Sequence, residues 1–273
     1  MVRTGKKTKR WPVAIVGIAL AALGGLAVVL LQKEPMLPDP STEPVQTQTQ
    51  APTIPLSSLS PGDFAEVDGF LTCGLVETVI GIDVSKYQGD VDWTQVKAAG
   101  VEFVMVRLGY RSYGDGTLYA DPMAQANLTG AREAGLLVGA YFYSQATTPT
   151  EAEEEAAYAL EILGDFRLDL PLSFDWEIEK RTEAVNVKTA TACAIAFCET
   201  VEAAGCGTMI YFNSNQATER LDLTRLTEYG WWLAMYSHDR EFPCRFDLWQ
   251  YTQTGTVAGI EGNVDINIML PAF

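Results

Sequence analysis

A short acidic segment contains the residues of this chain that could most directly do chemistry. Residues 174–179 alternate between apolar and acidic types. Successive side chains of a β-strand point to opposite faces, so Asp175, Glu177 and Glu179 would share one face. Carboxyl groups held this close repel one another when ionised, which raises the pKa of the less solvated group. A proton held at neutral pH is what a general acid needs. The alternative is an edge strand with a solvated acidic face.

Two further acids lie in the first and last apolar segments of the folded region. Asp83 lies near the end of a strand predicted at 79–84, and Asp265 lies in a strand predicted at 264–269. The first and last strands of a barrel are neighbours, so these two carboxyl groups could approach each other. Each alone is more often a cap or turn residue. Taken together, the acids predict a catalytic cluster of Glu177, Asp175, Asp83 and Asp265.

Aromatic and amide side chains gather near the ends of the other predicted strands. Most would belong to the core if each were considered alone. Around a carboxyl cluster, however, ring faces would stack on sugars, and polar tips would bind hydroxyl and acetamide groups. The predicted substrate-binding residues are Tyr141, Tyr143, Tyr211, Asn213, Trp232, Tyr236, Trp249 and Gln250.

The elements that must position these residues alternate along the chain. Strands are predicted at 79–84, 103–110, 137–144, 172–178, 208–213, 231–236, 246–251 and 264–269. Helices are predicted at 93–99, 122–134, from a capping box at Thr148, at 187–204 and at 216–229. Five βα units followed by three strands indicate an α/β fold with a closed or nearly closed barrel. Active sites of such barrels form at the C-terminal ends of the strands.

Composition excludes several classes of function. The chain has 19 basic against 35 acidic residues, and five of the basic ones lie in the first ten positions. Because a surface with this excess of acidic residues repels phosphate backbones, we expect no nucleic-acid partner. His238 is the only histidine and no CxxC pair occurs, so neither a metal site, another cofactor nor a histidine-based triad is predicted. The five cysteines are interpreted as small buried residues, with pairing between molecules as the alternative.

The N-terminal part of the chain has the pattern of a membrane anchor and a linker. Residues 11–31 contain no charged residue, and a helix of this length would cover ~30 Å, the thickness of a bilayer core. Basic residues in 1–10 predict a cytoplasmic N-terminus and a single-pass protein whose remainder is extracellular. The alternative is a signal peptide that is cleaved and releases a secreted protein. Residues 32–62 are rich in Pro, Ser, Thr and Gln and predict a disordered linker before a folded domain at 63–273.

Several segments together resemble the glycoside hydrolase family 25 lysozymes, the Chalaropsis-type N-acetylmuramidases. They are GIDVSKYQG (81–89), FVMVR (103–107), LPLSFDWE (170–177), LWQY (248–251) and GIEGNVDIN (259–267). The resemblance implies a flattened TIM-like barrel of five βα units plus three strands for 63–273. It also implies hydrolysis of the β-1,4 bond between N-acetylmuramic acid and N-acetylglucosamine in peptidoglycan.

The same resemblance implies a role for each acid. Glu177 looks like the general acid, and Asp175 looks like the partner that stabilises positive charge or orients the 2-acetamido group. Asp83 and Asp265 match the other two acids of the family. Many members have a histidine where this chain has Phe142, which removes a polar contact and could shift subsite preference.

The expected function is therefore that of an enzyme acting on peptidoglycan glycan strands. We expect a monomeric catalytic domain tethered to the cell membrane through residues 11–31. One alternative is a catalytically inactive module that binds peptidoglycan, and another is a glycosidase of a different N-acetylated polysaccharide. The intact Asp-x-Glu pair argues against the inactive module, because close like charges are costly to keep without a use.

Overall fold

The structure, a computed structural model, describes residues 53–237 and 241–270. The predicted cytoplasmic segment, the predicted anchor at 11–31 and most of the predicted linker lie outside these residues. Within the described ranges, none of the helices combines the length and apolar character that a membrane span requires.

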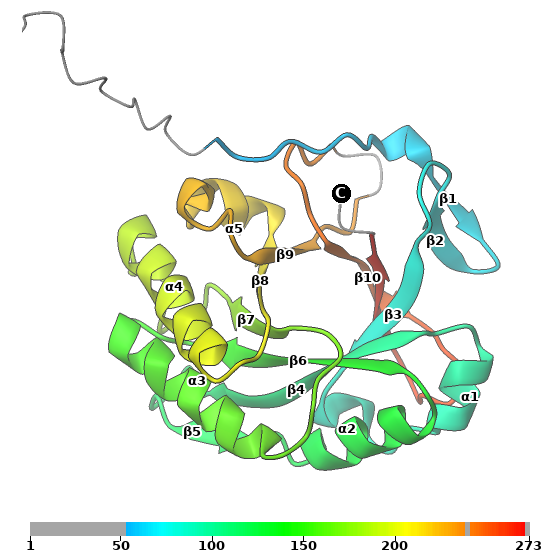
Figure 1. The fold of residues 1–273 in the computed structure, drawn as a ribbon, viewed down its shortest axis with the longest axis horizontal. Coiled ribbons are helices and arrows are strands. Elements are labelled where there is room, and N and C mark those ends of the chain that lie inside the picture. Colours follow the sequence, from blue (N-terminus) through cyan, green and yellow to red (C-terminus); the bar gives the residue numbers. More distant parts are fainter. Residues whose placement is uncertain (1–52, 238–240, 271–273) are drawn as a thin grey trace, which may run out of the picture. The chain divides into compact units, whose positions relative to one another are not determined.

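Eight strands form a closed barrel in the described part of the chain (Figure 1). Around the barrel the order is β3, β11, β10, β9, β8, β7, β6 and β4, and β4 pairs with β3 to close it. Strands β10 and β11 are antiparallel, as are β11 and β3, whereas the other neighbours within the barrel are parallel. The predicted eight-stranded α/β barrel is confirmed. The strand bounds are β3 Val79–Val84, β4 Phe103–Arg111, β6 Leu137–Ser144, β7 Leu172–Trp176, β8 Thr208–Asn213, β9 Gly230–Ala234, β10 Leu248–Gly255 and β11 Val264–Met269.

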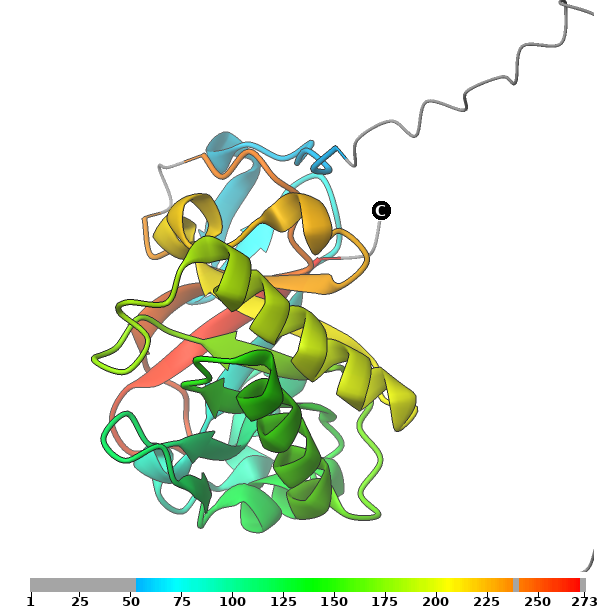
Figure 2. The same cartoon turned by 90° about the vertical axis from the view of Figure 1, so that its left-hand side faces the viewer.

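One α-helix follows each of the first five barrel strands. Helix α3 contacts β4 and β6, and helix α4 contacts β7 and β8, so the two long helices cover one side of the barrel. Figure 2 shows them side by side in front of the strands. The five predicted βα units are confirmed. The helix bounds are α1 Trp93–Ala98, α2 Ala124–Glu133, α3 Pro149–Leu163, α4 Val187–Ala203 and α5 Ser214–Glu219, with 3₁₀ turns at Lys86–Gln88 and Leu223–Arg225.

The predicted start of α3 is confirmed in its cap. The Thr148 side chain accepts a hydrogen bond from the Glu151 backbone N–H, and Pro149 occupies the first helical position. The loop predicted between the second strand and α2 contains an extra strand, β5 (Leu118–Ala120), which pairs antiparallel with the end of β4. A three-residue strand at a sheet edge leaves too short a pattern to be read from sequence.

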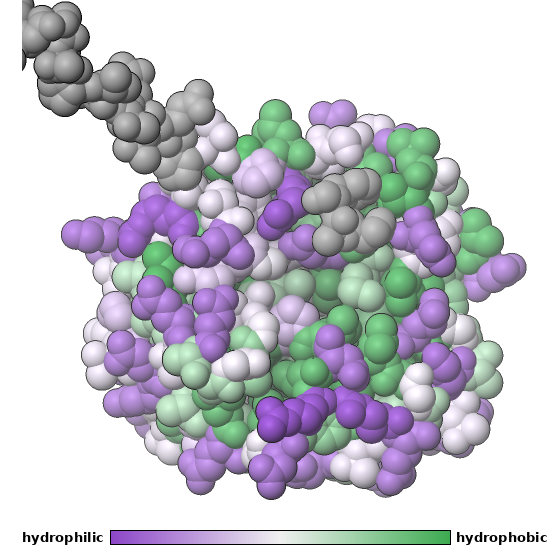
Figure 3. Space-filling model, viewed as in Figure 1, coloured by the Kyte–Doolittle hydropathy of each residue, from purple (hydrophilic) through white to green (hydrophobic). Residues whose placement is uncertain are grey.

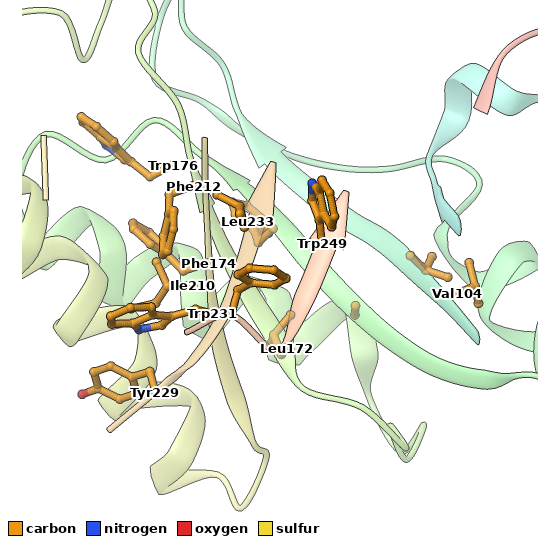
Figure 4. Packing of buried hydrophobic residues seen from close by; sticks show 14 of the residues in the cluster. Val104, Leu172, Phe174, Trp176, Ile210, Phe212, Tyr229, Trp231, Leu233 and Trp249 are labelled. Atoms are coloured by element: carbon orange, nitrogen blue, oxygen red, sulfur yellow. The ribbon is translucent and has the colours of Figure 1, made fainter. Parts of the chain in front are cut away.

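Side chains alternate between the two faces of each barrel strand. One apolar layer therefore lies outside the barrel, under the helices, and another lies inside it. On β7, Leu172, Phe174 and Trp176 point outward and pack under the helices, beside residues of β8 and β9 (Figure 4). A second cluster fills the barrel interior and includes Phe103 and Met105. Gly81 faces this interior, where an added Cβ would lie 2.3 Å from the Phe103 ring. The interior therefore has a packed, largely apolar floor below the level of the acids.

A hairpin covers the outward face of β10. It consists of β1 (Phe64–Val67) and β2 (Phe70–Cys73), preceded by a 3₁₀ turn at Pro61–Asp63. The Phe64 ring meets the Trp249 ring edge to face at 5.0 Å, and the Leu71 N–H donates to the Tyr251 hydroxyl at 3.2 Å. These aromatic contacts bury Trp249 and make the hairpin part of the folded domain.

The C-terminal end of the predicted linker is part of the chain that the structure describes. Leu56 forms an antiparallel bridge with Cys244, and the Ser57 N–H donates to the Pro243 carbonyl at 2.9 Å. The described residues of the predicted linker, 53–62, therefore run along the domain. Their low apolar content suggested a disordered segment, but backbone hydrogen bonds hold them, and Ile54 and Leu59 pack against the core.

The surface of the described residues is mainly hydrophilic. In Figure 3 hydrophilic side chains are spread over the whole face toward the viewer, around smaller groups of hydrophobic ones. Cys193, Cys198 and Cys244 are buried, and the first two lie within α4, as expected for small apolar residues, whereas Cys73 and Cys206 are only partly buried.

Candidate active site

A cleft of about 250 Å³ opens at the C-terminal ends of the parallel strands and contains all four predicted acids. Asp83 comes from β3, Asp175 and Glu177 from β7 and the residue just after it, and Asp265 from the start of β11. Because β11 runs antiparallel to β3, its first residues lie beside the last residues of β3, and Asp265 pairs in register with Asp83. The barrel therefore brings together carboxyl groups that are up to 182 positions apart in the sequence.

Two side-chain amides hold Asp83 in place. Gln250 Nε2 and Asn267 Nδ2 each donate to Asp83 Oδ2 at 2.8 Å. The Asn267 Oδ1 atom accepts from the Trp232 indole N–H at 2.8 Å, which fixes the orientation of that amide. Gln250 Oε1 accepts from the hydroxyls of Tyr211 (3.0 Å) and Tyr236 (2.8 Å). Four predicted site residues thus form one hydrogen-bonded network around Asp83.

Asp83 and Asp265 lie opposite each other on neighbouring strands, and their pKa values are both raised, so the pair retains a proton near neutral pH. Burial raises the pKa of Asp83, and the amides of Asn267 and Gln250 oppose this rise because they donate to the ionised form. Burial and the neighbouring Asp83 raise the pKa of Asp265 to about 8. We therefore place the shared proton on Asp265.

Asp175 and Glu177 are the second crowded pair. Burial raises the pKa of Asp175 well above its usual range, and the Glu177 carboxylate adds to the rise. Burial also raises the pKa of Glu177, assisted by Glu179 and opposed by a hydrogen bond from the Tyr143 hydroxyl. Asp175 is buried, and its Oδ1 atom has no hydrogen-bond partner among the described residues. Two such groups do not both ionise readily near neutral pH, so the pair retains a proton.

The backbone after β7 is fixed by hydrogen bonds from behind the cleft. The Glu177 carbonyl accepts from Thr182 Oγ1 at 2.7 Å and from Gln145 Nε2 at 3.2 Å. Arg181 pairs with Glu151 in the first turn of α3 at 2.5 Å and donates to the Gln145 carbonyl. This bonding holds the turn that presents Glu177, so the carboxyl projects from a rigid base.

Glu179 does not share the cleft with the other two acids of its segment. The strand β7 ends at Trp176, so the expected alternation stops before Glu179 is reached. Glu179 is exposed in the following turn and lies on the wall of a neighbouring groove. The expectation that all three acids project together is therefore wrong for Glu179.

Six of the eight predicted substrate-binding residues line the cleft, and two do not. Trp249 lies on the outward face of β10, because its neighbour Gln250 points inward and adjacent strand residues alternate. Its indole N–H donates to the Met235 carbonyl at 2.8 Å. Asn213 is occupied as the N-cap of α5, where its side chain accepts from the Asn215 and Gln216 N–H groups. The residues of the set that line the cleft are Tyr141, Tyr143, Tyr211, Trp232, Tyr236 and Gln250.

Sequence reasoning missed five residues of the cleft wall: Ser85, Tyr87, Gln88, Arg107 and Gln253. A signal existed for Arg107, because a lone charge inside the apolar strand 103–110 is costly unless it is paired. Its guanidinium pairs with Asp121 at 2.7 Å.

The described residues contain no group of three or more histidine, cysteine or acidic side chains arranged to hold a metal ion. The Oδ2 atom of Asp83, which accepts from two amides, is already engaged within the protein.

The raised pKa of Asp265 predicts a specific dependence of stability on pH. In the unfolded chain an aspartate releases its proton near pH 3.8, whereas in the fold Asp265 keeps it until about pH 8. The folded state thus binds more protons between these values, and this contribution to stability is lost as pH rises through about 8. We expect Asp265→Asn to flatten the decline of the melting temperature between pH 4 and pH 8. A variant that keeps the wild-type decline would contradict this assignment.

The barrel has paired carboxyl groups in a cleft at the C-terminal ends of its parallel strands, and tyrosine and tryptophan line this cleft. This arrangement is typical of glycoside hydrolases. The family model of glycosyl hydrolases family 25 matches residues 82–260. The chain belongs to this family, so the family recognised from the sequence is confirmed.

Individual relatives agree with the family. The chain is 27% identical over 188 residues to an autolytic lysozyme of Clostridium acetobutylicum, which covers 68% of this chain and 54% of that protein. It resembles the modular autolysin LytC from Streptococcus pneumoniae in complex with a synthetic peptidoglycan ligand. The TM-score is 0.60 and the identity 25%, covering 70% of this chain and 46% of that one. A bacterial lysozyme from Streptomyces coelicolor shares the fold, with a TM-score of 0.57, 23% identity, and 71% and 92% of the two chains covered. The chain thus spans about half the length of the first two proteins.

Proposed function

We propose that this chain hydrolyses the β-1,4 bond between N-acetylmuramic acid and N-acetylglucosamine in peptidoglycan, with Glu177 as the general acid. The main support for this proposal is that one cleft with aromatic walls contains all four acids, Asp83, Asp175, Glu177 and Asp265. Family membership supports it, as do a relative named as an autolytic lysozyme and a similar structure that contains a peptidoglycan ligand.

The proposed chemistry uses the proton retained by the Asp175–Glu177 pair. Glu177 gives its proton to the glycosidic oxygen while the bond from that oxygen to the sugar C1 breaks. The positive charge that develops on the sugar ring as this bond breaks is stabilised by the ionised form of Asp175. Water supplies the hydroxyl that ends on C1, and its remaining proton returns to the carboxyl cluster. Asp83, held by two amides, keeps its carboxylate fixed in the same cleft.

The test is digestion of purified peptidoglycan by the full chain, with mass spectrometry of the products. Hydrolysis at the proposed bond leaves N-acetylmuramic acid at the new reducing end. Products that end in N-acetylglucosamine would assign a different bond. Binding without any cleavage would instead support the inactive peptidoglycan-binding module.

The same chemistry predicts how activity depends on pH. Burial raises the pKa of Glu177, and the proton must be present for catalysis, so the rate should fall as pH rises through the apparent pKa of the cluster. This apparent value belongs to the coupled acids together and should lie above the ~4.3 of an isolated glutamate. Initial rates on soluble glycan strands across the pH range measure it. A rate that keeps rising at alkaline pH would rule out an acid catalyst in this cleft.

We further propose that residues 11–31 anchor the protein in the cell membrane with the hydrolase domain outside. Support comes from the uncharged run and the basic cluster that precedes it. Protease added to intact protoplasts should then remove the domain, while the N-terminal segment stays with the membrane fraction. Recovery of a soluble protein that begins near Ala22 would favour the cleaved signal peptide.

A further inference from the structure

A second groove opens directly beside the catalytic cleft. Its volume is about 770 Å³, roughly three times that of the cleft. Tyr87, Arg107 and Tyr143 line both cavities. Tyr143 also lines the cleft together with Glu177, so the groove begins next to the proposed general acid. A substituent on a sugar bound at Glu177 would therefore enter this groove.

The groove has aromatic walls that the proposed hydrolysis does not use. Tyr110 on β4 and Tyr119 on β5 stack with their ring centroids 5.4 Å apart and an interplanar angle of 23°. Tyr113, in the loop between these strands, is 60% exposed, and Tyr87 is 76% exposed. Exposed rings that are held by a hairpin offer flat apolar surfaces to small side chains or to sugar faces.

The positively charged side chains of the groove differ in whether they already have an ion-pair partner. Arg107 pairs with Asp121 at 2.7 Å, and Arg111 pairs with Glu155 at 2.7 Å and Glu154 at 3.1 Å. These two guanidinium groups are therefore already neutralised.

Lys86 is different from the two arginines. Its ammonium lies 5.4 Å and 5.2 Å from the ring centroids of Tyr87 and Tyr110. No carboxylate of the described residues lies within ion-pairing distance of it, including Glu179 on the same groove wall. In a chain of net charge −16, this cation beside the active cleft is available to an anionic ligand.

We propose that this groove binds the O3 substituent of muramic acid, with the Lys86 ammonium pairing with a carboxylate of that substituent. The inference rests on the proposed function and names what distinguishes the substrate. N-acetylglucosamine carries only a hydroxyl at O3, whereas muramic acid carries a lactyl group that either ends in a carboxylate or continues into a peptide stem. A neutral sugar would use the tyrosine faces but would leave the lysine charge unmatched. The groove therefore selects peptidoglycan over uncharged polymers of N-acetylglucosamine.

Calorimetric titration of the full chain with three ligands tests the proposal. They are chitobiose, which has no O3 substituent, the disaccharide of N-acetylglucosamine and N-acetylmuramic acid, and the same disaccharide with its peptide stem. A charge-assisted hydrogen bond that is lost should weaken binding of carboxylate-bearing ligands about tenfold in Lys86→Met. Lys86→Arg should restore most of the affinity. Lys188→Met, which makes the same change at an exposed site on α4, should leave all three affinities at wild-type values.

The results separate the two sources of carboxylate. A loss confined to the disaccharide without a stem would assign the free lactyl carboxylate, because an amide bond consumes that group in the ligand with a stem. A loss confined to the ligand with a stem would assign a carboxylate of the peptide, and equal losses would show that Lys86 accepts either one. Lys86→Met that weakens chitobiose equally, or weakens none of the ligands, would overturn the proposal. Lys86→Gln, checked by thermal melting, replaces Lys86→Met if the latter does not fold.

Failure of the proposed function would be recognised separately. A chain that discriminates among the three ligands through Lys86 but cleaves no peptidoglycan would overturn the hydrolysis and leave the groove assigned. A chain that cleaves peptidoglycan but binds all three ligands equally would overturn the groove alone.

Discussion

Glu177→Gln should reduce turnover of peptidoglycan by about 10²–10⁴-fold, because general-acid catalysis is typically worth that much. Glutamine keeps the shape of the side chain and a hydrogen-bonding group toward Tyr143, but it has no proton to transfer. The rate of release of new reducing ends from purified glycan strands is the measurement.

Stability should distinguish this loss from unfolding. The pKa of Glu177 is raised in the fold by burial and by Glu179, so its ionisation opposes folding at neutral pH. Removing the carboxyl group should leave the melting temperature unchanged or slightly higher. Glu161→Gln makes the same change at an exposed position on α3 and should retain full turnover and stability. A Glu177→Gln protein that melts normally and keeps more than about a tenth of wild-type turnover would refute the acid role.

A substrate with a good leaving group makes the test specific to proton donation. The phenolate of an activated aryl glycoside departs without protonation, so Glu177→Gln should slow its cleavage far less than that of a natural glycan. Asp175→Asn should slow both substrates, because charge on the sugar ring develops with either leaving group. An equal loss on both substrates in Glu177→Gln would instead assign Glu177 to charge stabilisation.

Long apolar segments made the barrel predictable. The bounds of β3, β6, β8 and β11 agree with the predicted strands, because each is a mostly apolar segment flanked by turn residues. Elements that depend on neighbours were less visible. The short strand β5 exists because the end of β4 offers it hydrogen bonds, and residues 53–62 are held by backbone bonds to 243–245.

The acids of the cleft were predictable for a similar reason, since charged residues within mostly apolar strands have few structural explanations. Wrong assignments arose because aromatic and amide residues near a strand end were all assigned to the cleft, without regard to the face of the strand on which each lies. Trp249 and Gln250 are adjacent and were assigned to one platform, although alternation places only Gln250 in the cleft. Lys86 carried no signal at all, because its importance depends on which acids lie near it in space, and sequence separation does not report that.

The second large effect is expected behind the cleft, where a buried ion pair links β4 to α3. Arg111 Nε donates to Glu155 Oε1 at 2.7 Å, and the Glu155 side chain is fully buried. Glu155 Oε2 has no hydrogen-bond partner among the described residues. Desolvation therefore outweighs the attraction of Arg111 and raises the pKa of Glu155 to about 7. The carboxylate is tolerated at neutral pH mainly because the arginine is present.

Arg111→Met should therefore lower the free energy of unfolding by about 3–5 kcal/mol at pH 8, the usual cost of stranding one member of a buried pair. Because a raised pKa favours the protonated form in the fold, the group's stabilising contribution is present at low pH and lost as pH rises through about 7. The destabilisation by Arg111→Met should accordingly be smaller at pH 5, where Glu155 is neutral. Denaturant unfolding at both pH values measures the difference.

Two variants isolate the stranded charge as the cause. Arg111→Met combined with Glu155→Leu removes both charges and should recover much of the lost stability, because apolar replacements of buried ion pairs are often neutral. Arg132→Met makes the same change in the exposed pair with Asp169 and should cost no more than about 1 kcal/mol. If Arg111→Met were as mild as Arg132→Met, or if its cost were the same at pH 5 and pH 8, Glu155 would not be the charge that Arg111 compensates. The hydrogen bonds of Arg111 to the Gly116 and Glu151 carbonyls, each 2.9 Å, would then account for its effect.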